Sequence, residues 1–290
     1  MLSSTKRTDF ANLNLQINKL ELTFAVSSEL WKEKNMFFEN VIGILEKYWE
    51  LLLSGIGYTM LISLTGTVIG LLIGLMTGII RTIPISKVGW IAILQKIANG
   101  AIAAYVEIFR GTPMMVQAMV IFWGYAFMMG GKTLSLVPAG IFIVSINTGA
   151  YMAEIVRGGI ISIDKGQFEG AAACGMNHFQ TMVHVVIPQV MRNILPSISN
   201  EFVINIKDTS VLNVIGVMEL YSIAGKIQVM TFKMFETYLI VCVIYFILTF
   251  SITRLLRLAE KKLSGTDSYT ICGSQSDPAA EIHIKGEEAN

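Results

Sequence analysis

Residues 167–188, QFEGAAACGMNHFQTMVHVVIP, form a polar segment between long apolar stretches of the chain. The segment is too polar to span a bilayer, and its alanine-rich beginning, residues 167–174, favours a helix. Gly175 interrupts this helix, and in the helix that follows four apolar residues fall at i, i+3, i+4 and i+7. These residues are Phe179, Met182, Val183 and Val186. The pattern predicts two short helices joined at a glycine outside the membrane.

The second of these helices also has a polar side, which consists of His178, Gln180, Thr181 and His184. Pro188 either ends this helix or begins the next one. One wet side and one apolar side suit docking into a groove on a soluble partner. They also suit an amphipathic loop that rests on lipid, and helical periodicity does not separate the two interpretations.

The same segment resembles the EAA loop of the inner-membrane permeases of ABC importers. The resemblance is carried by Glu169-Gly170-Ala171, by Gly175 after three intervening residues, and by the Val-Val-Ile-Pro of residues 185–188. In that family the loop is the coupling helix, which sits in a cleft of the ATPase subunit. The resemblance therefore implies that six residues contact an ATPase: Glu169, Gly170, Ala171, Gly175, Phe179 and Pro188.

The loop departs from the family pattern at three positions. Gly170 stands where alanine is usual, and Val185 and Ile187 replace Ile and Leu. All three residues keep the small or apolar character of the pattern.

Three further stretches are similar to the polar amino acid permeases, the subfamily of histidine, glutamine and arginine permeases. They are residues 105–117 (YVEIFRGTPMMVQ), 149–159 (GAYMAEIVRGG) and 200–210 (NEFVINIKDTS). The resemblance covers about residues 51–263 and implies an all-α integral membrane protein with about five transmembrane helices and a cytoplasmic coupling-helix loop, the type I ABC importer fold. The implied function is that of a permease subunit of an ATP-driven importer that moves polar amino acids into the cytoplasm.

The composition independently indicates a membrane protein. Of the 290 residues, 53% are hydrophobic and only 15% are charged, against about 25% charged residues in soluble domains. The apolar residues are concentrated in long stretches, as in membrane spans. The net charge of +1 gives no reason to expect a nucleic-acid partner. The three cysteines, Cys174, Cys242 and Cys272, are scattered without metal-binding spacing, and we expect no disulfide.

We divide the chain into four parts. Residues 1–36 form a polar tail that we expect to be disordered, and residues 37–50 an interfacial amphipathic helix with Tyr48 and Trp49 at the headgroup level. Residues 51–263 form the transmembrane domain of an ABC permease, and residues 264–290 a disordered cytoplasmic tail.

The first span, residues 51–80, contains no charged residue. It is long enough to cross the bilayer, which requires about 20 apolar residues. Within it, glycine recurs at every fourth position: Gly66, Gly70, Gly74 and Gly78. This spacing predicts a groove of small residues that lets another helix approach closely.

Four more spans follow. We expect them at residues 88–129, 133–153, 192–217 and 237–253, with a mixed loop at 219–236. The sequence Gly111-Thr112-Pro113 predicts a kink in the second span. Glu107 and Arg110 are three residues apart on a helix and are expected to pair.

Positive charge falls mainly on one side of these five spans. That side holds Arg81, Lys87, Arg157, Lys165, Arg192 and the basic cluster at 254–262. The positive-inside rule therefore places the N-terminus outside the cell membrane and both the C-terminus and the docking loop in the cytoplasm.

Glu201 is the main candidate for a substrate contact. It lies nine residues after Arg192, so a helix raises it about 13 Å above the cytoplasmic edge, close to the middle of the bilayer. A carboxylate there is costly unless it faces a polar cavity or a partner. The alternative to a substrate contact is a structural ion pair with Lys207 or Arg110. Ser197, Glu201, Asn205 and Asp208 share one helix face, and the further substrate candidates are Ser197, Asn200, Asn205 and Asn147.

No residue pattern predicts catalysis or a metal site. Gly130-Gly131-Lys132-Thr133 lacks the first glycine of a phosphate-binding loop, because Ala126 occupies that position. His178 and His184 are six residues apart, not the four of a helical metal pair. We therefore expect no cofactor in this chain, and ATP with Mg in a separate ATPase.

The expected partners follow from the resemblance. They are two ABC ATPase subunits, a second permease copy or paralogue, an extracytoplasmic amino-acid-binding protein, a polar amino acid and the lipid bilayer. An ion-gradient-driven secondary transporter is the alternative function, but its internal repeats are not seen here. A membrane enzyme is a further alternative, but no catalytic groups converge.

Overall fold

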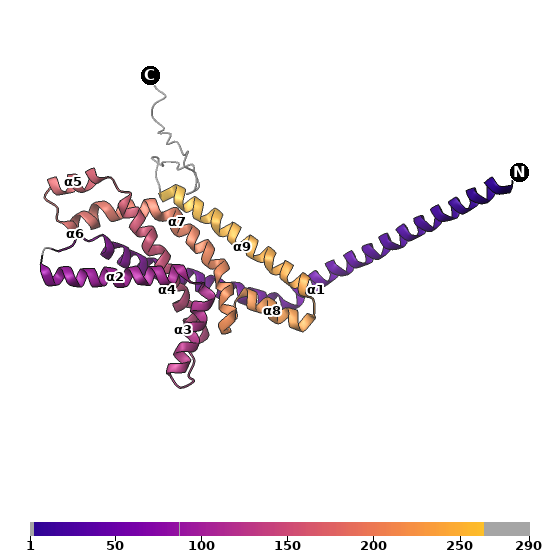
Figure 1. Cartoon of the computed structure of the whole chain (residues 1–290), viewed down its shortest axis with the longest axis horizontal. Helices are drawn as coiled ribbons and strands as arrows, with labels where there is room; N and C mark the ends of the chain where they lie inside the picture. Colours follow the sequence, from indigo (N-terminus) through magenta and orange to yellow (C-terminus); the bar gives the residue numbers. More distant parts are fainter. Residues whose placement is uncertain (1–2, 87, 264–290) are drawn as a thin grey trace, which may run out of the picture. The chain divides into compact units, whose positions relative to one another are not determined.

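The computed structural model describes residues 3–86 and 88–263, with side chains over 36–86 and 88–262. Every regular element in these ranges is helical (Figure 1). The α-helices are α1 (Ser3–Thr82), α2 (Gly89–Gly111), α3 (Met114–Met128), α4 (Leu136–Ile161), α5 (Lys165–Ala173), α6 (His178–Thr181), α7 (Ile187–Asp208), α8 (Leu220–Thr231) and α9 (Met234–Leu263). A π-helical turn, η1 (Met182–Val186), precedes α7, and a 3₁₀ segment, η2 (Thr209–Ile215), follows it. The expected C-terminal tail, 264–290, lies outside the described residues.

Long apolar helices account for the expected membrane spans. Among the described residues, four helical stretches are long and apolar enough to cross a membrane: Met36–Thr82, Gly89–Gly111, Leu136–Ile161 and Met234–Lys262. A fifth span results if His178–Ile215 and Leu220–Thr231 are counted as one broken span. The expectation of about five spans agrees with this upper count.

The second expected span is not one kinked helix. It consists of two helices, because α2 ends at Gly111 and α3 begins at Met114. Pro113 has extended backbone angles and precedes α3 as its N-cap. Proline lacks the backbone N–H and forces the residue before it out of the helical region, so the chain breaks here rather than bending.

The chain divides into two compact units, which are described separately. The first comprises the residues up to Gly57 together with Met218–Ile244. In this unit the side chain of Asn40 donates to Glu236 at 3.0 Å and accepts from Lys233. Tyr48 interrupts the regular backbone of α1, with φ −118° and ψ 15°, close to the expected junction of the interfacial helix and the first span. α1 itself begins at Ser3, within the expected tail.

The segment expected as a mixed loop at 219–236 is largely α8. Glu219 caps this helix, since its carboxylate accepts from the backbone N–H groups of Tyr221 at 2.9 Å and Ser222 at 2.7 Å. An acidic side chain is favourable at this helix end because it satisfies free N–H groups and the helix dipole. The expectation of a loop missed this cap because Glu219 was read as a loop charge.

The second unit comprises Tyr58–Val217 and the residues from Tyr245 onward. Here the four glycines of α1 lie against α4. A Cβ added to Gly66 would come within 2.5 Å of Val144, and one added to Gly70 or Gly78 within 2.7 Å of Thr148 or Val156. At Gly74 the approach to Met152 is closer still. The α4 partners are themselves four residues apart, so the two backbones run in contact over three turns.

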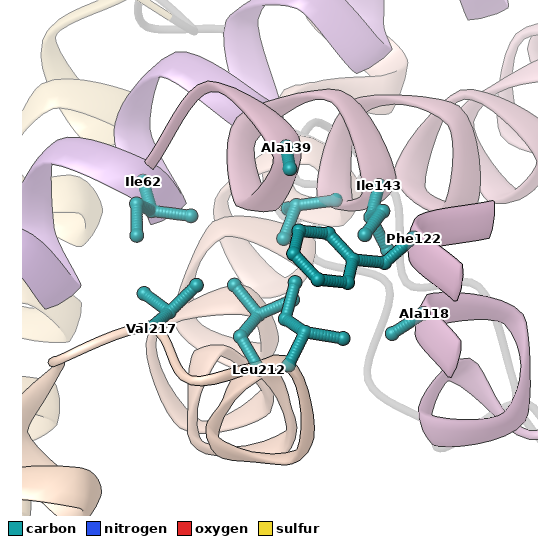
Figure 2. Close-up of a cluster of buried hydrophobic side chains, with 9 residues drawn as sticks. Ile62, Ala118, Phe122, Ala139, Ile143, Leu212 and Val217 are labelled. Atoms are coloured by element: carbon teal, nitrogen blue, oxygen red, sulfur yellow. The ribbon is translucent and has the colours of Figure 1, made fainter. Parts of the chain in front are cut away.

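One apolar cluster joins α1, α3, α4 and η2 in this unit. Figure 2 shows the ring of Phe122 at its centre, with Ile143 and Leu212 close by and Ile62 and Val217 beyond. All of these side chains are buried. The cluster fixes α3 and η2 against α4, and so sets the position of the helix α7 that η2 continues.

Candidate functional site

The coupling-loop candidate begins with α5, a helix whose two ends are capped by local residues. At its start the Asp164 carboxylate accepts from the backbone N–H of Gly166 at 2.7 Å. At its end Met176 N–H donates to Ala171 O at 3.0 Å, and Gly175 N–H donates to Ala172 O at 2.9 Å. This pair of bonds is a Schellman motif, which requires a left-handed residue after the helix. Gly175 supplies it, with φ +77°.

The next turn of helix, α6, has its own start signal. The Asn177 side chain accepts from Gln180 N–H at 2.9 Å, and the Gln180 side chain accepts from Asn177 N–H at 2.9 Å. This reciprocal capping box satisfies backbone donors that the helix start leaves free. The chain therefore has two short helices separated by Gly175, as its alanine run and glycine indicated.

Between α6 and α7 the backbone takes one π-helical turn, in which Ile187 N–H donates to Met182 O. Pro188 follows directly and has no N–H to donate to the carbonyl four residues earlier. A wider turn avoids the clash that a proline ring makes with that carbonyl. Pro188 therefore lies at the beginning of α7 and does not end the helical path.

The π turn corrects the expected apolar stripe of the second helix. Met182 and Val186 are buried, but Phe179 is 73% exposed and Val183 is also exposed. The stripe was derived from 3.6 residues per turn, whereas a π turn holds more residues and shifts their phase. Two of the four apolar side chains therefore lie on the outer surface.

The inner side of this segment belongs to an apolar cluster, here called the α4–α7 cluster. Its buried members are Val156, Ile160, Ile163, Met182, Val186, Val190 and Ile194. Phe168 of α5 packs against it, and Gln189 of α7 donates to Gln167 at 3.2 Å. α5 is therefore attached to the ends of α4 and α7 by side-chain contacts as well as by the chain.

Five of the six coupling candidates lie on the outer surface and one does not. Glu169, Gly170, Gly175 and Pro188 are exposed, as is Phe179. Ala171 is only 6% exposed and faces inward, so it supports α5 rather than offering a contact to a partner. A Cβ built on Gly170 meets nothing within 4 Å, which leaves open space above the helix.

The polar face of α7 holds Glu201, which is only 8% exposed. Within the described ranges this carboxylate forms no ion pair, and neither of the expected partners reaches it. Arg110 lies over the ring of Tyr151, 5.6 Å from its centroid. The expected Glu107–Arg110 pair does not form either, since the arginine is taken up by this aromatic contact.

Two residues close to Glu201 in the chain face α9. Asn200 and Val203 of α7 line one cavity together with Thr253 and Arg257 of α9. The depth expected for Glu201 in the bilayer stays a prediction.

Two asparagines predicted to bind substrate are engaged in bonds between helices. Asn205 donates to Thr67 of α1 at 2.8 Å and accepts from Thr148 of α4 at 3.1 Å. Asn147 donates to Gln117 of α3 at 2.9 Å. These bonds tie α7 to α1 and α4, and α4 to α3.

The last two substrate candidates, Ser197 and Asn200, lie in different environments. Ser197 is half-buried on the same face as Glu201, four residues earlier. Asn200 is exposed and lines the cavity beside α9. Successive helical residues point about 100° apart, so Asn200 and Glu201 face different neighbours.

Residues 86–265 match the family described as the binding-protein-dependent transport system inner membrane component. The chain belongs to this family. The match begins after α1 and runs through α9, so the permease family covers the coupling-loop candidate and all of α7.

Two curated members of this permease family are similar in sequence to the chain over most of their length. The glutamine transport system permease protein GlnP of Escherichia coli K12 is 36% identical over 213 residues, which is 73% of this chain and 93% of the relative. The L-cystine transport system permease protein TcyB of Bacillus subtilis is 32% identical over 219 residues, or 75% and 88% of the two chains. These relatives support an ABC permease and not an ion-gradient-driven secondary transporter.

Solved structures show the same fold. A crystal structure of an amino acid ABC transporter with histidines is similar with a TM-score of 0.65 at 36% identity, covering 75% of this chain and 96% of that one. The inward-facing MetNI methionine ABC transporter matches with a TM-score of 0.58 at 19% identity, covering 74% and 99%. This permease therefore has the all-helical fold of type I ABC importers.

Sequence reasoning about this permease missed several residues that join its helices. Thr67, Thr148 and Gln117 are buried hydrogen-bond partners. A signal was present at Thr67 and Thr148, because each is a polar residue next to a glycine in an apolar span. At the end of α4, Glu154 pairs with Arg81 of α1 and, at 2.9 Å, with Arg157. The spacing of Glu154 and Arg157 is that of a helical ion pair.

Proposed function

We propose that this permease carries polar amino acids into the cytoplasm as part of an ATP-driven importer. The observation that carries the proposal is the 36% identity to a glutamine permease over 93% of that protein's length. The similarity to a cystine permease and to an amino acid ABC transporter supports the same substrate class. The ligand would be a zwitterion, which calls for both a carboxylate and hydrogen-bond donors along its path.

The partners proposed are two ATPase subunits, a second copy of this chain or a paralogue, and an extracytoplasmic amino-acid-binding protein. ATP and Mg would be held by the ATPases. Closure of the ATPases would move the outer face of α5, and the α4–α7 cluster would carry this motion to α4 and α7. The packing of Phe168 and the burial of Ala171 support this route, because a helix attached on its inner side transmits displacement.

Coupling is tested by adding bulk at Gly170, where a side chain has open space within the chain itself. Gly170→Leu should fold normally and yet reduce ATPase association and ATP-driven uptake severalfold, since the added side chain would occupy the space of the partner. Gly158→Leu is the matched control, because Gly158 is also exposed with nothing within 4 Å of its added Cβ. Unchanged ATPase copurification with Gly170→Leu would contradict the proposal.

The proposed orientation places the N-terminus outside and α5 in the cytoplasm, because positive charge collects on the α5 side. Cys174 is exposed at the end of α5 and gives a direct test. With Cys242 and Cys272 replaced by serine, a membrane-impermeant thiol reagent should label Cys174 only after cells are opened. Labelling of intact cells would reverse the orientation.

The proposed substrate contact is Glu201, a buried carboxylate with no ion-pair partner in the described residues. It would bind the α-ammonium group, with Ser197 on the same face. A charge-assisted hydrogen bond contributes about 1.5–3 kcal/mol, so Glu201→Gln should lower uptake roughly tenfold or more. Asn200→Ala, one residue earlier on another face, is the control. Normal uptake by Glu201→Gln would show that Glu201 does not contact the substrate. Loss of ATPase binding by the same variant would indicate a structural role.

A further inference from the structure

A cavity of about 230 Å³ lies between α7 and α9, apart from the coupling loop and from the buried polar face of α7. Its lining residues are Val203, Lys207, Phe246, Thr249, Phe250, Thr253, Arg254 and Arg257. Neither the polar stripe of Glu201 nor the α5 surface includes any of them. The cavity therefore needs an explanation of its own.

The charged groups that line the cavity are all cationic. Lys207, Arg254 and Arg257 contribute three positive charges, and no acidic residue of the described ranges lines it. None of the three forms an ion pair within those ranges. The guanidinium of Arg254 lies over the ring of Phe250, 5.0 Å from its centroid, which limits its orientations. The cavity is thus suited to an anion.

The hydroxyl groups in the cavity do not change this preference. Thr249 donates to Tyr245 O at 2.8 Å, and Thr253 donates to Thr249 O at 2.7 Å. Their protons are used within α9, so the donors that remain for a ligand are the ammonium and guanidinium groups. Arginine in particular matches the oxygens of phosphate.

The position along α9 distinguishes between kinds of anion. Residues 237–253 carry no charge, and Arg254 is the first charged residue after them. Arg254 and Arg257 therefore lie where an apolar span ends and phospholipid phosphates begin. Lys207 comes from α7 opposite them, and its long apolar stem lets its ammonium group reach the same level. Phe246, which is 65% exposed, and Phe250 also line the cavity, and both belong to the uncharged run that precedes Arg254.

We propose that this cavity binds the phosphate of an anionic phospholipid, with its acyl chains along Phe246 and Phe250. The three cations would be near the phosphate, and the aromatic rings would contact the chains. A zwitterionic lipid such as phosphatidylcholine is disfavoured, because its choline group would bring a fourth positive charge to the site. The site goes beyond amino acid transport and does not depend on which amino acid is carried.

The test uses the purified full-length permease with whatever ATPase copurifies, reconstituted in phosphatidylglycerol, in phosphatidylcholine or in a mixture. Lipid retained after detergent washing is measured by mass spectrometry. The wild type should retain phosphatidylglycerol in preference to phosphatidylcholine. Lys207→Gln, Arg254→Gln and Arg257→Gln should each lower that retention roughly fivefold. Arg192→Gln is the control, since Arg192 is an exposed arginine of α7 outside the cavity.

Further measurements distinguish a bound lipid from other anions. Glycerophosphate and inorganic phosphate should not displace phosphatidylglycerol, because they lack the chains that Phe246 and Phe250 contact. Arg254→Lys should retain more lipid than Arg254→Gln if charge is the cause. Equal retention of both lipids by the wild type would overturn the proposal, and this comparison requires no variant to fold. Displacement of the lipid by free phosphate, or by amino acid, would also overturn it and assign the cavity to a soluble anion or to the transport path.

Discussion

Two helix contacts in the second unit differ in how closely the backbones approach. α1 lies against α4 so tightly that Cβ atoms at Gly66, Gly70, Gly74 or Gly78 would overlap α4. α7 and α9, by contrast, are separated by two open cavities of about 230 Å³ each. In a bilayer, helix association depends on close packing rather than on hydrophobic burial. The glycines let α1 and α4 make that contact, whereas between α7 and α9 Phe, Thr and Arg side chains of α9 line open space.

The largest effect should come from Gly74→Val, which breaks the tight contact. The added side chain would overlap Met152 of α4 in a span that cannot shift without moving its neighbours. We expect a loss of about 3 kcal/mol or more in the free energy of unfolding, seen as loss of monodisperse protein and a lower melting temperature. Gly57→Val on the same helix is the control, since its Cβ meets nothing within 4 Å. Equal stability of the two variants would show that α1 and α4 do not pack as described.

A smaller effect is expected from Asn205→Ala, which removes both bonds between α7 and the tight pair α1 and α4. The two bonds measure 2.8 Å to Thr67 and 3.1 Å to Thr148. Hydrogen bonds between membrane helices contribute about 0.6 kcal/mol each, up to about 1.7, so we expect a loss of about 1–2 kcal/mol in thermal unfolding. Asn200→Ala, exposed on the same helix, should change little. A similar loss in both variants would contradict a stabilising role for the Asn205 hydrogen bonds.

A third variant, Arg81→Gln, tests the end of the tight contact. Arg81 of α1 pairs with Glu154 of α4, and both side chains are about one-fifth exposed. Partly exposed ion pairs contribute about 1 kcal/mol or less, and we expect a loss of that size in the melting curve at low salt. Arg157→Gln should cost less, because its pair lies within α4 and joins no helices. The reverse order would indicate that the α4 pair matters more than the link to α1.

The smallest effect should come from Thr253→Leu, which adds volume to the open contact. Thr253 lines both α7–α9 cavities, and its hydroxyl bonds only within α9. We expect the free energy of unfolding to stay within about 0.5 kcal/mol of the wild type. A loss as large as that of Gly74→Val would show that α7 and α9 are packed as tightly as α1 and α4.

The features that could be predicted from sequence are those decided by neighbours along the chain. The glycine after α5 is required by the left-handed turn that ends it. At Pro113 the sequence predicted the disturbance but not its extent, since a kink was expected and the chain forms two separate helices. The family and fold followed from long motifs in order. The substrate candidates were harder, because Asn147 and Asn205 have partners on helices 30 or more residues away. Nothing in a single helix pattern reports such partners.

The sequence pattern also did not predict which side of the coupling loop faces outward. Ala171 and Phe179 were both expected to contact a partner, but only Phe179 is exposed, whereas Ala171 is buried. Which side of a short helix is buried is decided by the cluster it packs on, and here the π turn changes the phase between that helix and α7.

The π turn at Met182–Val186 also determines how this loop tolerates changes in length. A π turn holds one residue more than the α-helical turn it replaces. Deleting one residue there would restore a regular helix and rotate everything before it by about 100° relative to α7. Phe168 would then leave the α4–α7 cluster, and α5 would present a different side to the outside. Along this loop, single-residue deletions are therefore expected to be less tolerated than substitutions at its exposed positions.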